Sequence, residues 1–165
     1  MELYKYDFTY IVTVLNVRTI YYITDKPIER EVVVEYGTDA SIQQGTELIN
    51  QLSCMVEKQP TKTVIYVPNP MINNKSSFLS KEEIQTIQKQ VRMILQAAHR
   101  ADATEIAINV GGNVCFESVI RVIQMTLHEK NGLFTTITIC CPNTKCRTTF
   151  RDVFRPSGIL NESVN

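Results

Sequence analysis

Short runs of β-branched residues alternate with longer amphipathic segments along most of this chain. The runs at 31–36, 63–67, 105–110 and 135–141 are of the kind found in buried strands. The segments between them carry apolar residues at three- and four-residue steps, as helices do. From residue 31 onward the predicted order is β-α-β-α-β-α-β-α, which favours a largely parallel sheet with helices on both faces.

Local signals set the expected boundaries of these elements. The clearest helix is predicted behind the capping box Ser80-Lys81-Glu82-Glu83. Another is expected over 41–56, a third after Gly111-Gly112-Asn113, and a short final one up to Phe154. Two further strands, at 10–15 and 19–24, should add to one edge of the sheet. The predicted fold class is a three-layer α/β/α sandwich with a central mixed, largely parallel sheet.

Composition and charge fit one domain without a strong electrostatic preference. A chain of 165 residues suits a single core, here expected over 1–155, with 156–165 as a flexible tail. Lys plus Arg equals Asp plus Glu at 17 each, so nothing attracts the whole chain to nucleic acid or anionic membrane. No apolar run approaches the roughly 20 residues of a membrane span. Five cysteines and an acidic first segment predict reduced thiols and an intracellular, cytoplasmic or nuclear location.

Parallel α/β sheets bind ligands at the carboxyl ends of their strands, and Gly111-Gly112-Asn113 is the best candidate for such a site. Two glycines let backbone approach a ligand, and the amides beyond them open a helix, where phosphate is favoured. The alternative is a tight turn with no ligand. A P-loop nucleotidase and a standard dinucleotide fold are disfavoured, because GxxxxGK[ST] and GxGxxG are both missing.

Histidines and cysteines offer little further chemistry. His99 and His128 lie on separate predicted helices, outside any HExxH or nucleophile signature, and are interpreted as surface or helix-end residues. Cys140, Cys141 and Cys146 suggest a zinc site, but the sequence has no second cysteine pair, so packing roles are favoured. No metal and no cofactor are expected.

Arg147, Arg151 and Arg155 recur every four residues along the last predicted helix. Such a basic stripe could meet phosphate, nucleic acid or an acidic protein partner. The alternative is an ordinary solvated helix face. The stripe therefore supplies a hypothesis for a partner surface.

Most of the chain, from about residue 10 to 154, resembles the macro domain, the module that binds ADP-ribose. The strongest stretch, 97–116, is similar to the family's helix, strand and glycine-containing phosphate loop. Residues 64–70 resemble its central strand, and residues 33–48 its first ligand loop. The ligand-binding residues that the resemblance implies are Asn16 near the base, Asp39 and Gly45 near the distal ribose, and Gly111, Gly112, Asn113, Val114, Cys115 and Phe116 around the diphosphate.

Several positions depart from the family pattern. Asp39 stands where an asparagine often contacts the distal ribose, and Asn16 stands where an aspartate usually recognises adenine. Gly45-Thr46-Glu47 replaces a run of three glycines, and Glu47 would repel a diphosphate. The resemblance implies a reader of ADP-ribose, a related nucleotide or an ADP-ribosylated partner, and the departures disfavour hydrolase activity. The alternative is a degenerate macro-like module for protein or nucleic-acid interaction that has lost ADP-ribose binding.

Overall fold

The chain is described by a computed structural model that covers residues 8–14, 17–26, 28–44, 54–72, 78–129, 133–141, 143–155 and 159–162. The predicted ligand contacts Asn16 and Gly45 lie outside these residues.

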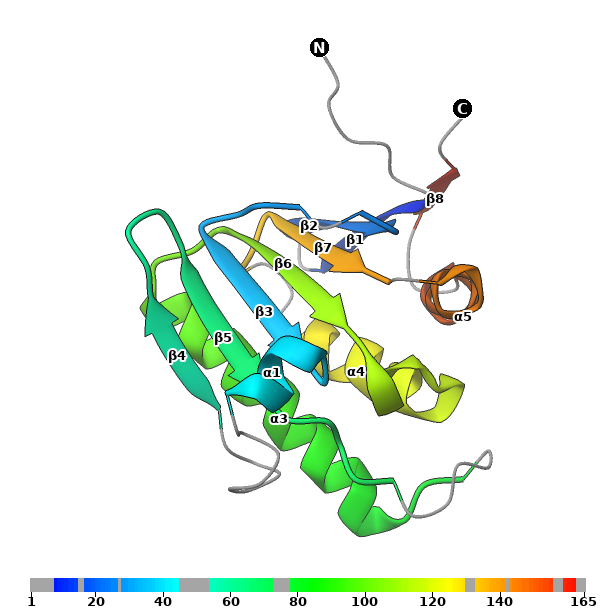
Figure 1. Cartoon of the computed structure of the whole chain (residues 1–165). Coiled ribbons are helices and arrows are strands. Elements are labelled where there is room, and N and C mark those ends of the chain that lie inside the picture. Colours follow the sequence, from blue (N-terminus) through cyan, green and yellow to red (C-terminus); the bar gives the residue numbers. More distant parts are fainter. Residues whose placement is uncertain are drawn as a thin grey trace.

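Among the described residues, eight strands form one mixed sheet in the order β4-β5-β3-β6-β7-β2-β1-β8 (Figure 1). The strands are β1 (Phe8–Val14), β2 (Val17–Thr24), β3 (Val32–Tyr36), β4 (Met55–Lys58), β5 (Thr63–Val67), β6 (Glu105–Val110), β7 (Thr136–Cys140) and β8 (Ile159–Glu162). The five central strands β5, β3, β6, β7 and β2 run parallel, while β4, β1 and β8 pair antiparallel at the two edges. The parallel centre and the placement of the N-terminal strands toward one edge confirm the sequence-based prediction.

Helices cover the two faces of the sheet unequally. The first face carries α3 (Lys81–Arg100), α4 (Glu117–Glu129) and α5 (Thr144–Phe154). On the second face the only helix in the described part of the chain is α1 (Asp39–Gln43), which lies in front of the sheet in Figure 1. The three-layer α/β/α sandwich is therefore confirmed, with one thick and one thin helical layer.

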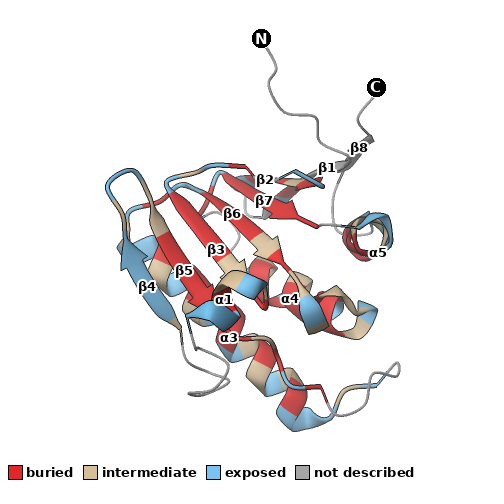
Figure 2. Cartoon of the chain, in the orientation of Figure 1, coloured by how far each residue is buried: buried red, intermediate tan, exposed pale blue. Residues whose placement is uncertain are grey.

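The core lies between the sheet and its thick layer. The inward stripe of α3 includes Ile87, Val91 and Ile94, and the central strands are buried while β4 is exposed (Figure 2). A buried polar pair fixes α3 against the sheet, since Tyr36 Oη donates to Gln90 Oε1 at 2.6 Å. Burial of an apolar helix stripe supplies most of the stabilisation of such a layer.

Two segments differ from their predicted structure. The helix expected over 41–56 is represented among the described residues by the five residues of α1, and Met55–Lys58 forms β4 instead. Met55 and Val56 pair with β5, so strand pairing outweighs the helical spacing that their side chains suggest. Ile159–Glu162 pairs with β1, so the sheet extends into the segment predicted as a flexible tail.

In the described part of the chain, no helix combines the length and the apolar character needed to cross a membrane.

Candidate functional site

The turn after β6 has the backbone that its glycines predict. Gly111 is extended at φ −152°, and Gly112 adopts a positive φ of 52° at the start of the short 3-10 helix η1 (Gly112–Cys115). A positive φ is accessible to glycine at little cost. The turn leads through Phe116 directly into α4, as the phosphate-loop hypothesis expects.

Asn69 joins this turn to the loop after β3. The Asn113 backbone amide donates to Asn69 Oδ1 at 2.8 Å, and the Asn113 side chain donates to the Pro70 carbonyl at 2.9 Å. An added Cβ at Gly37 or Gly112 would lie within 2.6 Å of the Asn69 carboxamide. The Asn69 carboxamide therefore fits between the two loops because Gly37 and Gly112 have no side chains. It also accepts the hydrogen bond of the Asn113 amide, one of the amides predicted to hold phosphate.

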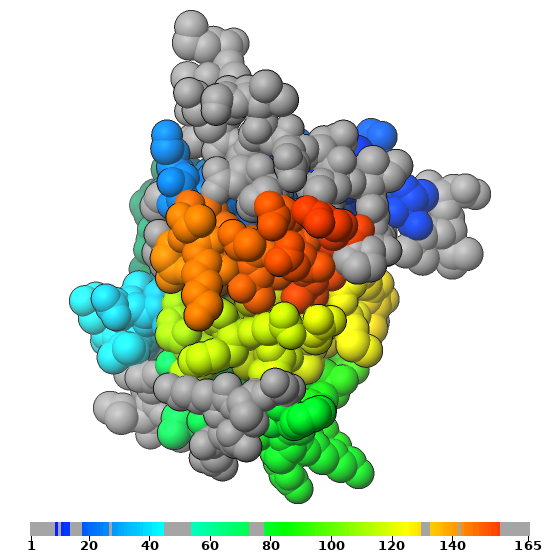
Figure 3. Space-filling view, turned by 90° about the vertical axis from the view of Figure 1, so that its right-hand side faces the viewer, coloured from blue at the N-terminus to red at the C-terminus, as the bar shows by residue number. Residues whose placement is uncertain are grey.

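A cavity of about 560 Å³ lies over the second face of the sheet and reaches from Lys62, just before β5, to the carboxyl ends of β3, β6 and β7. Val33 and Cys140 contribute to its wall, and Gly111 and Gly112 lie at its rim. Figure 3 looks onto the end of the molecule that lies on the right in Figure 1, with α1 in cyan at the left and α5 in orange above the yellow-green residues that follow β6. The volume lies within the range of small-molecule pockets, which is roughly 300–1,000 Å³.

Glu35 and Asn109 form a polar floor in this cavity. They are register partners on β3 and β6, with Cys140 next in the same row on β7. Glu35 accepts from Thr38 Oγ1 and from Asn109 Nδ2, both at 2.8 Å. The buried Asn109 Oδ1 has no hydrogen-bond partner. A buried acceptor without a partner is costly, so this carbonyl is suited to a donor on a ligand or a water.

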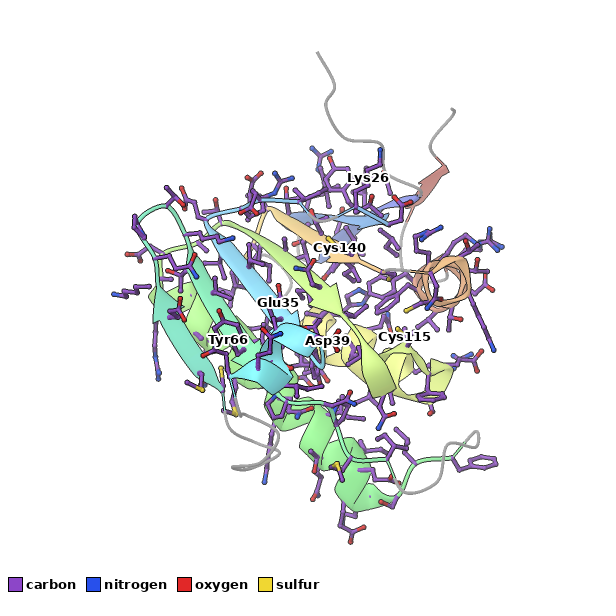
Figure 4. All side chains as sticks on the ribbon, in the orientation of Figure 1. Lys26, Glu35, Asp39, Tyr66, Cys115 and Cys140 are labelled. Carbon is purple, nitrogen blue, oxygen red and sulfur yellow. The ribbon has the colours of Figure 1, made fainter. Side chains whose placement is uncertain are left out.

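Tyr66 continues this polar row on β5, where it pairs in register with Glu35 (Figure 4). The pKa of the Tyr66 hydroxyl is raised by desolvation, then by the Glu57 and Glu35 carboxylates, against an opposing effect of Lys62. The phenol therefore stays protonated and neutral across the physiological range.

The charge of the cavity wall is mainly negative. Its described lining contains four carboxylates, and Lys62 is its only basic side chain. Lys62 Nζ already pairs with Glu29 Oε2 at 3.1 Å. The remaining three carboxylates of the lining are those of Asp25, Glu35 and Asp39.

The predicted ligand contacts are distributed unevenly around this cavity. Asp39, the exposed first residue of α1, lines it together with Gly111 and Gly112. Asn113, Val114, Cys115 and Phe116 do not contribute to the lining, and Val114 is fully buried in the core. The structure thus brings the two loops together at one cavity, and their roles toward a ligand remain predictions.

Sequence reasoning missed Glu35 and Asn109. Both belong to runs that the sequence presents as apolar strands, although each lies one residue before the end of its strand. Alternation along β3 puts Val33 and Glu35 on the face opposite Val34 and Tyr36. The available signal was Glu35 itself, a carboxylate one residue before the carboxyl end of a predicted central strand, where ligand sites of parallel sheets lie.

The cysteines are free and largely buried. Cys115 and Cys146 are hydrogen-bonded through their side chains, an interaction that together with burial raises the pKa of the Cys115 thiol. Burial raises the pKa of Cys140 to about 11. The described residues contain no group of three or more His, Cys, Asp or Glu side chains arranged to hold a metal ion. Protonated thiols are poor nucleophiles, and packing remains the role predicted for these cysteines.

The arginines of α5 have partners within the chain. Arg147 donates to the Cys141 carbonyl and to Thr144 Oγ1, at 3.2 and 3.0 Å. Arg151 pairs with Asp152 at 3.1 Å, and Arg155 is exposed. Two of the three guanidinium groups thus have local contacts, and the basic stripe remains a hypothesis.

Comparison with solved structures identifies the fold. The macrodomain of Oceanobacillus iheyensis with ADP bound matches at a TM-score of 0.65 and 9% identity, covering 90% of this chain and 95% of that one. The same macrodomain with MES bound matches at 0.65 and 9%, covering 90% and 96%. The Trypanosoma brucei macrodomain in complex with ADP-ribose matches at 0.59 and 13%, covering 80% and 68%.

The chain therefore has a macrodomain fold, as its sequence resemblance implied. No protein-family model and no curated protein matches its sequence. At these identities the likeness concerns the fold and not the residues of the pocket.

Proposed function

We propose that this chain is a binding module that takes ADP-ribose or a related nucleoside ligand, free or attached to a protein, in the cavity beside Glu35. The observation that carries the proposal is a ligand-sized cavity that reaches the carboxyl ends of the central parallel strands, where Gly37 and Gly111 border it. This is the position at which open α/β sheets bind ligands. The macrodomain fold and the solved macrodomains with ADP or ADP-ribose bound support the same ligand class.

The module binds its ligand without hydrolysing it. Hydrolysis needs the reacting carbon held within a few tenths of an ångström of its productive position. The amides of Asn113 and Val114, which would fix a diphosphate, already donate to Asn69 Oδ1 and to the Gly111 carbonyl. Incubation with an ADP-ribosylated protein should release no ADP-ribose above a protein-free control.

Isothermal calorimetry with ADP-ribose tests binding directly. We expect measurable heat with a dissociation constant between about 10 µM and 1 mM, as a partly polar open cavity would give. Asn109→Ala should weaken it about tenfold, because it removes the unpartnered acceptor of the floor. Gln96→Ala, at an exposed position of α3 on the other face of the sheet, is the matched control and should change nothing.

Failure of ADP-ribose, ADP and adenosine to bind at about 10 mM would reject the proposal. The interaction-module alternative would then remain, with the α5 arginines as its first surface to test.

A further inference from the structure

We propose that the cavity recognises the nucleoside part of its ligand and disfavours the diphosphate, with Glu35 as the specificity-determining residue. This inference rests on the proposed function and narrows its ligand class to nucleosides and to nucleotides bound through their sugar and base. Three features of the structure lead to it, namely the turn after β6, the charge of the lining and the acceptors of the floor.

The first feature is the state of the turn expected to hold phosphate. Anion sites at helix starts depend on backbone N–H groups that point at the ligand. Here the Asn113 amide donates to Asn69 Oδ1 at 2.8 Å, and the Val114 amide donates to the Gly111 carbonyl at 3.1 Å. Asn69 therefore supplies, from within the chain, the oxygen acceptor that a phosphate would otherwise provide.

The second feature is the charge of the lining. The Lys62 ammonium group is paired with Glu29, which leaves Asp25, Glu35 and Asp39 as carboxylates of the same lining. A diphosphate in the cavity would share it with these like charges, of which Glu35 is half-buried and therefore the least screened by solvent. A neutral nucleoside is not subject to this repulsion.

The floor offers acceptors that a nucleoside can satisfy. Each Glu35 oxygen accepts one hydrogen bond, from Thr38 and Asn109, and a carboxylate oxygen can accept a second. Asn109 Oδ1 adds a buried acceptor without a partner. Ribose hydroxyls and an exocyclic amine are donors, whereas an ionised phosphate has only acceptors, so the floor matches the nucleoside.

Calorimetry with adenosine, ADP and ADP-ribose at low and high salt tests this assignment. We expect adenosine to bind at least as tightly as ADP. Raising the salt concentration from about 50 to about 500 mM should lower the dissociation constants of ADP and ADP-ribose about threefold, because salt screens the repulsion. The dissociation constant of adenosine should stay unchanged. A phosphate-binding site would show the opposite sign, with salt weakening both anionic ligands.

Glu35→Gln tests the residue itself. This variant should weaken the binding of adenosine about tenfold. The binding of ADP should weaken less, because one repulsive charge is removed together with the acceptor. Glu82→Gln, at an exposed position of α3, is the matched control and should leave both affinities unchanged. If Glu35→Gln does not fold, the salt dependence of the unmodified chain still decides the question.

The outcomes separate the inference from the function it rests on. ADP-ribose that binds more tightly than adenosine and weakens with salt would overturn the nucleoside assignment and leave the binding module intact. Equal effects of Glu35→Gln on adenosine and ADP would remove Glu35 as the specificity determinant. Absence of binding by all three ligands would overturn both proposals.

Discussion

Replacing Gly112 with alanine should lower the free energy of unfolding by about 2–4 kcal/mol. A non-glycine residue at the φ of 52° costs about 1–2 kcal/mol in backbone strain. The new Cβ would also lie 2.5 Å from Asn69 Nδ2, so the carboxamide must move. Its movement leaves the Asn113 amide without its acceptor, which costs about 1–3 kcal/mol for a buried donor and less at this half-buried position.

Urea denaturation of Gly112→Ala, Asn69→Ala and the double variant measures these terms as a double-mutant cycle. Asn69→Ala alone removes the acceptor and the obstruction together. In that background Gly112→Ala should cost only the backbone term, so the two substitutions should be coupled by about 1–2 kcal/mol. A loss below about 0.5 kcal/mol for Gly112→Ala, or additive losses, would refute the role given to Asn69.

Three further predictions concern the scaffold, and each is read by urea denaturation. Ser80→Ala should cost about 1 kcal/mol, because Ser80 and Glu83 exchange hydrogen bonds in the capping box of α3, and an unchanged midpoint would contradict this. Tyr36→Phe should cost about 1–3 kcal/mol by removing the buried hydrogen bond from Tyr36 to Gln90 Oε1, and a neutral effect would show that Gln90 repacks. Burial lowers the pKa of His128 below 6.5, so the unfolded chain binds the proton more readily and stability should fall as pH decreases from about 7 to 5. His128→Gln should flatten that slope, and an equally steep slope in the variant would assign it to other groups.

Sequence patterns were sufficient for the central fold because several independent signals agreed. Each of the four β-branched runs from residue 31 onward became a parallel strand, and the capping box at Ser80 starts α3 as predicted. The edges were harder to predict. Met55 fits the spacing of a helix, and only the presence of β5 beside it makes a strand more favourable. Pairing of β8 with β1 likewise joins segments about 150 residues apart, which local patterns do not encode.

The site was predicted in position and not in detail. Spacing and glycine content located the Gly111–Gly112 turn, and the structure puts it at the cavity with Asp39. The contact between Asn69 and Asn113 crosses 44 residues and depends on the register of β5, β3 and β6. Glu35 was visible in the sequence, but its role depends on Asn109 lying beside it in the neighbouring strand.

Mapping adenosine binding onto backbone amides by NMR tests the central claim most directly. The account predicts saturable shifts at Thr38, Asn109 and Gly111 as adenosine is raised to about 10 mM, with the amides of the outer face of α3 unchanged. Shifts centred on α5, or no saturable shift anywhere, would contradict a nucleoside site over the floor formed by Glu35 and Asn109.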